Sequence, residues 1–276
     1  MGQLGGSVLL NAGIELPVLG LGVFRSAAGK TTRQAVSAAL EAGYRHIDTA
    51  AIYQNEADVG RAVRESGLDR DEVFITTKLW NSGHGYEQAL QAFKESKSKL
   101  GVDRVDLYLI HWPVPDLRLD TWRAMEHLLE EGEVRAIGVS NYMVRHLDEL
   151  LAHASQPPVV NQIELSPYNY RSRLDVVDYC GQRGIAIEAY SPLTKGQKLN
   201  DPALGSVGRP YGKTAAQALI RWAIDKGFVV IPKSTNTYRI VQNGDVFDFE
   251  LSAEDLARLD DLDENLVTGW DPTGAP

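Results

Sequence analysis

The chain has 276 residues, 43% of them hydrophobic, and a single cysteine, Cys180. Such a chain can bury a large core, and one cysteine excludes an internal disulfide and matches no zinc-ligand spacing. The formal net charge of −9 disfavours partners with anionic surfaces, such as nucleic acids and membranes. In addition, the sequence has no basic patch and no apolar run long enough to span a bilayer. We therefore expect a protein of the cytoplasm.

Strand signals recur along the chain. Residues 7–10 and 14–17 flank Asn11-Ala12-Gly13, which indicates an N-terminal β-hairpin placed to plug the bottom of a barrel. Eight β-rich runs follow, at 18–24, 44–48, 73–78, 105–111, 134–140, 159–163, 185–190 and 228–233. Apolar residues at helical spacing lie between them, so the pattern predicts eight βα units. The expected fold class is α/β, a closed parallel (β/α)8 TIM barrel.

Glycines and polar residues divide the chain at the same places. A glycine past each of six helical stretches provides a left-handed helix end: Gly43, Gly67, Gly101, Gly132, Gly184 and Gly227. We interpret 194–209 as one long βα loop, 252–262 as a last helix capped by Ser252, and 267–276 as an irregular tail. With no linker or second core, we predict one domain, 1–276.

Three ionisable residues end predicted strands. Asp48, Lys78 and His111 stand where the second, third and fourth runs stop, and Tyr53 follows Asp48 by five positions. In a barrel the C-terminal strand ends meet on one face. We expect the Lys78 ammonium to favour the phenolate of Tyr53, Asp48 to hold that ammonium charged, and His111 to hydrogen-bond a substrate oxygen.

Each of these residues also has a structural interpretation. Asp48 could cap the next helix, Lys78 could reach the surface from a strand end, Tyr53 could be an amphipathic core residue, and His111 could be satisfied at a barrel rim. Their joint position at one barrel mouth favours a functional interpretation instead.

The same residues resemble the aldo-keto reductase family. The stretch 43–50, with Tyr53 and Asn55-Glu56 after it, is similar to the first signature of that family. Further matches follow in order at 75–80, 106–113, 137–141, 161–164 and 231–234, so the resemblance runs from about Pro17 to Phe249. It implies that Asp48, Tyr53, Lys78 and His111 form the catalytic tetrad, with Tyr53 as general acid for carbonyl reduction.

The resemblance also implies NADPH bound across the barrel mouth. Ser140, Asn141 and Gln162 would bind the carboxamide, and Tyr190 would stack on the nicotinamide. Lys233, Ser234 and Arg239 would bind the ribose 2′-phosphate, which makes NADPH preferred over NADH. The remaining predicted cofactor contacts are Ser191, Leu193, Gln242 and Asn243. Singly, an ST-turn at Ser140-Asn141, a packed aromatic at Tyr190 and a solvated Arg239 are the structural alternatives.

Four aromatic residues are predicted to line the substrate pocket. Phe24, Trp80 and Trp112 lie just beyond strands, and Trp270 in the tail would close the slot over the nicotinamide. The resemblance is strongest to bacterial reductases of 2,5-diketo-gluconate, methylglyoxal and related small carbonyls. No metal is needed, because phenol, imidazole and ammonium together stabilise the developing alkoxide. Substrate choice depends on loops, where Ser166 replaces the His of many relatives.

Two rival functions remain open from the residues. A barrel aldolase would form a Schiff base at a desolvated Lys78, although Asp48 should keep that lysine charged and weakly nucleophilic. A non-catalytic subunit that senses NADPH would bind the cofactor with little turnover. With no coiled-coil heptads or long edge strand, a monomer is the default expectation.

Overall fold

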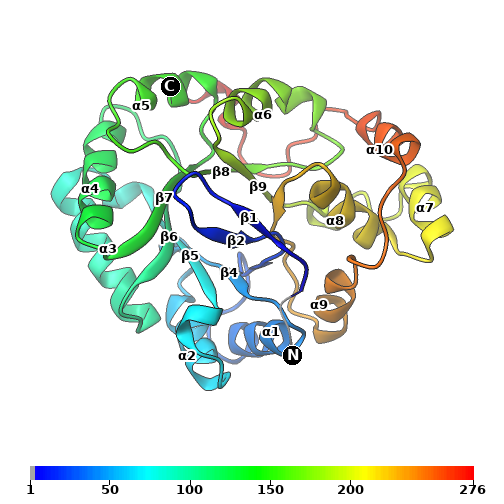
Figure 1. Ribbon diagram of the computed structural model, residues 1–276, viewed down its shortest axis with the longest axis horizontal. Coiled ribbons are helices and arrows are strands. Elements are labelled where there is room, and N and C mark those ends of the chain that lie inside the picture. The colour runs from blue at the N-terminus through cyan, green and yellow to red at the C-terminus, as the bar shows by residue number, and fades with distance from the viewer. Residues whose placement is uncertain (1–3) are drawn as a thin grey trace.

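The computed structural model describes residues 4–276, so the first three residues of the predicted domain lie outside it. Its centre is an eight-stranded parallel sheet in the order β10-β9-β8-β7-β6-β5-β4-β3 (Figure 1). The strands are β3 (Leu21–Gly22), β4 (His46–Asp48), β5 (Phe74–Leu79), β6 (Val105–Ile110), β7 (Val134–Ser140), β8 (Val160–Glu164), β9 (Ala186–Tyr190) and β10 (Val229–Val230).

The sheet closes on itself. Parallel bridges join Leu19 to Val230 and Gly22 to Lys233, and the Gly22 amide donates to the Pro232 carbonyl. The predicted (β/α)8 barrel is therefore confirmed. Strands β3 and β10 are shorter than the predicted runs at 18–24 and 228–233, because Pro232 has no N–H and the closing ladder is reduced to isolated bridges.

Helices surround the barrel on the outside (Figure 1). Their apolar faces pack on the outer faces of the strands in one large core that includes Trp122, Trp222 and Tyr108. The helices are α1 (Lys30–Glu41), α2 (Glu56–Glu65), α3 (Tyr86–Leu100), α4 (Arg118–Glu130), α5 (Val144–Leu151), α6 (Leu174–Gly181), α7 (Pro202–Gly208), α8 (Ala215–Asp225), α9 (Thr237–Gly244) and α10 (Ala253–Asp260). All six predicted helix-ending glycines have positive φ, as expected for left-handed caps.

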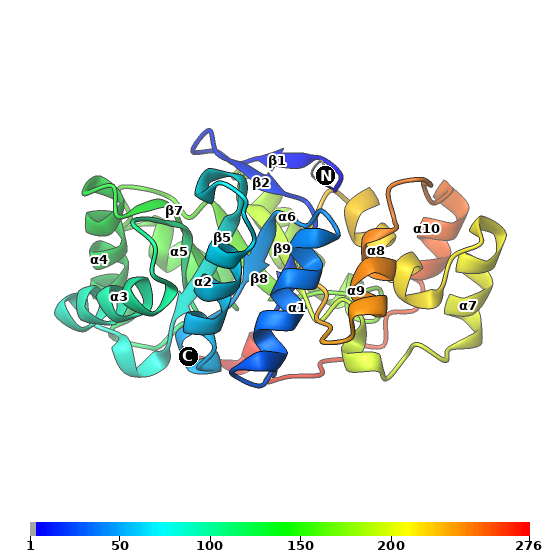
Figure 2. The same cartoon turned by 90° about the horizontal axis from the view of Figure 1, so that it is seen from below.

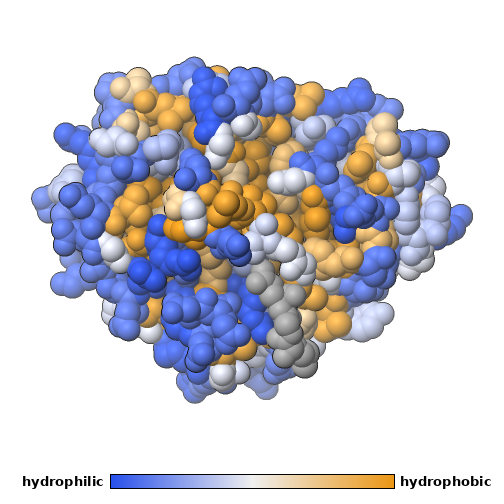
Figure 3. All heavy atoms as spheres, viewed as in Figure 1, coloured by the Kyte–Doolittle hydropathy of each residue, from blue (hydrophilic) through white to orange (hydrophobic). Residues whose placement is uncertain are grey.

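The N-terminal hairpin closes the bottom of the barrel. Strands β1 (Ser7–Leu9) and β2 (Glu15–Pro17) pair antiparallel, and Leu10 and Leu16 pack against a small core at the bottom of the barrel. This confirms the predicted plug. Figure 3, which views the hairpin side, shows apolar residues near the centre of this face and polar residues around its rim.

The C-terminal tail crosses the opposite side. In Figure 2 the hairpin lies on one side of the barrel and the chain after α10 runs along the other. Helix α10 begins after Ser252, whose hydroxyl accepts from the Asp255 amide, so the predicted cap is confirmed. The prediction of 194–209 as a plain loop is wrong, because it contains α7, which starts at an Asp201-Pro202 cap.

Candidate active site

The four predicted catalytic residues meet at the C-terminal end of the barrel. Lys78 is fully buried in β5, and its ammonium donates to both Asp48 oxygens, at 2.7 and 2.6 Å, and to the Thr49 carbonyl at 2.9 Å. Tyr53 ends a 3₁₀ turn (Ala51–Tyr53), and the Lys78 nitrogen lies 5.1 Å from its ring centroid. His111 directly follows β6, and its ring lies edge-on to the ring of Tyr53, with the two ring centroids 5.7 Å apart.

The electrostatics of Tyr53 differ from the sequence-based expectation. The pKa of Tyr53 is raised well above its ordinary value, first by burial and then by the carboxylates of Asp48 and Glu188. Burial and these two carboxylates therefore outweigh the effect expected from Lys78 in the unliganded site. The reason is that Asp48 accepts two of the ammonium hydrogens and offsets its charge. At neutral pH Tyr53 thus holds its proton at Oη.

His111 is neutral at physiological pH. Burial, and then the Lys78 charge, hold the pKa of its imidazole well below the ordinary value. Its Nδ1 is buried and has no hydrogen-bond partner among residues 4–276, whereas the ring lines the cleft. Nε2 is therefore the ring nitrogen that can reach a ligand.

A cleft of about 1010 Å³ opens above these residues. All four predicted aromatic wall residues line it: Phe24, Trp80, Trp112 and Trp270. Trp80 stands edge-on to His111 with ring centroids 5.3 Å apart, and Trp112 meets Trp270 at 4.7 Å. The walls are apolar around a few polar groups, as in pockets for small molecules.

One part of the cleft floor is built from amides at strand ends. Asn141 donates through Nδ2 to the His111 carbonyl and to Ser140 Oγ, and its Oδ1 accepts from the Tyr190 hydroxyl at 2.9 Å. Gln162 donates through Nε2 to Asp48 and Glu188, both at 2.9 Å. Their carbonyl oxygens are thus the ends with free acceptor capacity.

Of the predicted cofactor contacts, only Ser140 does not line the cleft. Its buried hydroxyl donates to the Gln162 carbonyl at 2.9 Å and accepts from the Asn141 side chain. Asn141 and Ser191, which directly follow β7 and β9, adopt left-handed backbone with φ of 64° and 50°. These reversals turn the chain away from the strand direction at the cleft floor.

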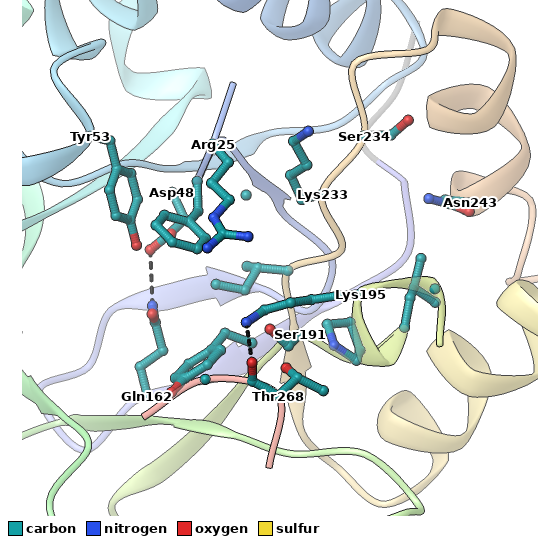
Figure 4. Close-up of a pocket in the computed structure, with 18 of the residues that line it drawn as sticks. Arg25, Asp48, Tyr53, Gln162, Ser191, Lys195, Lys233, Ser234, Asn243 and Thr268 are labelled. Carbon is teal, nitrogen blue, oxygen red and sulfur yellow. Dashed lines mark hydrogen bonds between the residues drawn. The ribbon is translucent and has the colours of Figure 1, made fainter. Parts of the chain in front are cut away.

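The far end of the cleft is cationic. Lys233, Ser234, Arg239, Gln242 and Asn243 all line it, from the segment after β10 and from α9. Figure 4 shows Lys233, Ser234 and Asn243 along one side of the pocket. Neither Lys233 nor Arg239 has an ion pair within residues 4–276. Two unpaired cations beside a hydroxyl suit an anionic group.

The tail crosses the cleft and is held from below. Lys195 donates to the Thr268 carbonyl, as drawn in Figure 4, and the Glu164 carboxylate accepts from the amides of Thr268 and Gly269 at 2.9 and 3.2 Å. Further along, Arg173 pairs with Asp271 at 2.9 Å. These contacts place Trp270 over the pocket.

Among the residues that sequence reasoning missed are three charged ones in the cleft or the barrel. Arg25 and Lys195 line the cleft, both with left-handed backbone, and Glu188 is fully buried beneath it. Glu188 had a detectable signal, since a glutamate at the centre of an apolar strand is costly to bury. No local signal distinguishes Arg25 and Lys195 from other surface cations.

Comparisons with known proteins agree with this geometry. The sequence model of the aldo/keto reductase family matches residues 18–264. Glyoxal reductase of Bacillus subtilis is 48% identical over 266 residues, which cover 96% of each chain. The crystal structure of an aldo/keto reductase from Brucella melitensis superposes with a TM-score of 0.89 at 49% identity, covering 93% of this chain and 99% of the other.

A third relative is a Bombyx mori aldo-keto reductase, solved in complex with NADP. It is 40% identical, with a TM-score of 0.89, and the match covers 97% of this chain and 95% of that one. The chain therefore belongs to the aldo/keto reductase family, a class of oxidoreductases. Within residues 4–276, no helix is long and apolar enough to cross a bilayer.

Proposed function

We propose that this protein reduces aldehydes, α-dicarbonyls or keto-sugars to alcohols with NADPH, and that Tyr53 donates the proton. The observation that carries the proposal is the cluster at the cleft floor: a phenol that holds its proton, a neutral imidazole 5.7 Å away, and a buried ammonium 5.1 Å from the phenol ring. The relative named glyoxal reductase, whose named substrate is an α-dicarbonyl, supports this substrate class.

The residues present fit NADPH. The acceptor oxygens of Asn141 and Gln162 match the two hydrogens of a carboxamide, and Tyr190 offers a ring beside them. Lys233 and Arg239 match a 2′-phosphate at the other end of the cleft. The NADP complex of the Bombyx mori relative supports the same cofactor.

Bound NADPH supplies a hydride from its nicotinamide ring to the carbonyl carbon. The chain supplies the rest of the reaction. His111 Nε2 hydrogen-bonds the carbonyl oxygen and polarises it, and Tyr53 Oη gives that oxygen its proton, so that the carbonyl becomes an alcohol. Lys78 stabilises the phenolate left behind, and Asp48 holds Lys78 in place. The aromatic walls keep water from the reacting groups.

The rival aldolase is disfavoured by geometry. A Schiff base requires a free amine that reaches the substrate, but Lys78 is fully buried, donates to three oxygens and does not line the cleft. The NADPH-sensing subunit shares the cofactor site and is distinguished by turnover. Monomeric state and cytoplasmic location stay predictions, as does the single domain 1–276.

The test measures NADPH oxidation against glyoxal, methylglyoxal, simple aldehydes and keto-sugars. Tyr53→Phe should lower kcat by at least ~100-fold while NADPH still binds, because general acid catalysis is lost. Tyr86→Phe, on α3 outside the cleft, is the matched control and should keep full activity. Tight NADPH binding by wild type without turnover on any substrate would favour the sensing subunit.

Cofactor choice has its own test. Arg239→Ala should raise KM for NADPH by ~10-fold or more and leave KM for NADH nearly unchanged, because only NADPH carries the 2′-phosphate. An equal rise for both cofactors would contradict the assignment of Arg239.

A further inference from the structure

Glu188 lies inside the barrel, directly beneath the cleft, and the proposed reaction gives it no role. It is fully buried at the centre of β9, and its neighbour in the parallel ladder is Gln162 on β8. Side chains alternate along a strand, so Glu188 and Tyr190 share the face of β9 that points into the barrel. A carboxyl in this position is costly unless its oxygens are used.

The contacts of Glu188 converge on one residue. Its Oε2 accepts from Gln162 Nε2 at 2.9 Å, and its Oε1 lies 3.5 Å from His46 Nε2 without a hydrogen bond. His46 supplies no positive charge, because burial and then the nearby Lys78 lower the pKa of its imidazole to about 3. Gln162 is thus the hydrogen-bond donor to Glu188 in the part of the chain that the structure describes.

Gln162 in turn has both amide hydrogens engaged. One is donated to Asp48 Oδ2 and the other to Glu188 Oε2, each at 2.9 Å. Figure 4 shows the bond from Gln162 to Asp48. The terminal torsion of glutamine is broad. With Asp48 as the only acceptor, the amide could rotate and turn its second N–H toward the cleft. Two acceptors remove that freedom and leave Oε1 as the polar atom of Gln162 that is available to the cleft.

We propose that Glu188 is a positioning residue that acts through Gln162. By accepting one amide hydrogen, it keeps Gln162 Oε1 turned to the cleft as an acceptor for the carboxamide NH₂ of the nicotinamide. This inference rests on the proposed function, because it requires NADP(H) in the cleft. An Oε1 held in this way makes the site selective for a carboxamide over a group of similar shape that cannot donate a hydrogen bond.

The test uses a matched pair of ligands, NADP⁺ and its 3-acetylpyridine analogue, in which a methyl group replaces the NH₂. Dissociation constants are measured by quenching of tryptophan fluorescence. Wild type should prefer NADP⁺ by ~10-fold, the equivalent of about one hydrogen bond. In Glu188→Met, which keeps the length but not the acceptor, Kd for NADP⁺ should rise ~10-fold and Kd for the analogue less than ~2-fold.

Three variants complete the design. Glu188→Gln has a carbonyl oxygen that can accept from Gln162, so it should restore the preference for NADP⁺. Ile187→Met changes the neighbouring side chain on the outer face of β9 and should affect neither ligand. In a Gln162→Met background, which removes the oriented group, adding Glu188→Met should cause no further loss of NADP⁺ affinity.

Each outcome separates the two proposals. Equal loss of both ligands in Glu188→Met, or no loss of either, would overturn the positioning role, as would a wild type that binds both ligands equally. A wild type that binds neither ligand would overturn the proposed function itself. Circular dichroism checks the fold, and Glu188→Leu replaces Glu188→Met if that variant does not fold.

Discussion

Replacement of Lys78 by methionine tests the buried ion pair at the centre of the site. Lys78 and Asp48 side chains are 0% and 3% exposed, and all three ammonium hydrogens are donated, two to Asp48 and one to the Thr49 carbonyl. Methionine keeps the length of the side chain and removes the charge. Among residues 4–276, Asp48 would then keep one side-chain donor, Gln162 at 2.9 Å.

The magnitude follows from leaving one buried charge without its partner. Breaking such a pair costs about 3–5 kcal/mol of unfolding free energy. The cost depends on pH, because burial already raises the pKa of Asp48 and Lys78 opposes that rise. Without Lys78 the pKa rises further, and a carboxyl whose pKa is raised on folding stabilises the fold at low pH and loses that contribution as pH increases.

The assay is urea unfolding at pH 5.5, 7 and 8.5, followed by tryptophan fluorescence and far-UV circular dichroism. The loss in Lys78→Met should be larger at pH 8.5 than at pH 5.5, and Lys78→Met with Asp48→Asn should recover at least half of it. Arg61→Met breaks an ion pair whose partners are 59% and 57% exposed, and should cause a much smaller loss that does not depend on pH in this range. A Lys78→Met loss below about 1 kcal/mol that is independent of pH would refute the reasoning.

Three further predictions concern packing and burial. Gly60→Ala should destabilise the fold by about 1–3 kcal/mol, because the added Cβ would lie 1.8 Å from the Leu100 carbonyl oxygen. Gly205→Ala, where the added Cβ meets open space, should stabilise the fold by about 0.5–1 kcal/mol. Urea unfolding measures both changes, and equal effects would contradict the packing argument. Cys180, fully buried with its pKa raised to about 11, should react with an aromatic disulfide reagent only on unfolding, and rapid labelling of the native protein would disprove this. Burial and the adjacent Asp48 raise the pKa of Glu188 from 4.5 to about 8, so the stability of the fold should decrease as pH rises between these values. Glu188→Gln should abolish that decrease. If thermal unfolding at pH 5 and 8 shows the same change of stability with pH in both proteins, the prediction is contradicted.

The positions of the strands and of the four central residues were predictable from the sequence. Runs of β-formers, helical spacing and six glycines at helix ends are local signals, and all of them report structure that forms within about 30 residues. The order of strands in a (β/α)8 barrel then places Asp48, Lys78 and His111 on one face. The hairpin and the Ser252 cap were also correctly predicted, because their sequence signals are local too.

Tertiary structure alone decided the charge balance at that face. The pKa of Tyr53 rises first because packing buries its phenol, and then because Asp48 and Glu188, which is distant in sequence, lie close enough to act on it. Likewise, Trp270 reaches the cleft because Glu164 and Lys195 hold the tail. Burial and electrostatic energies depend on distances between segments far apart in the chain, so sequence specifies which groups are present, and only packing determines which of them act on one another.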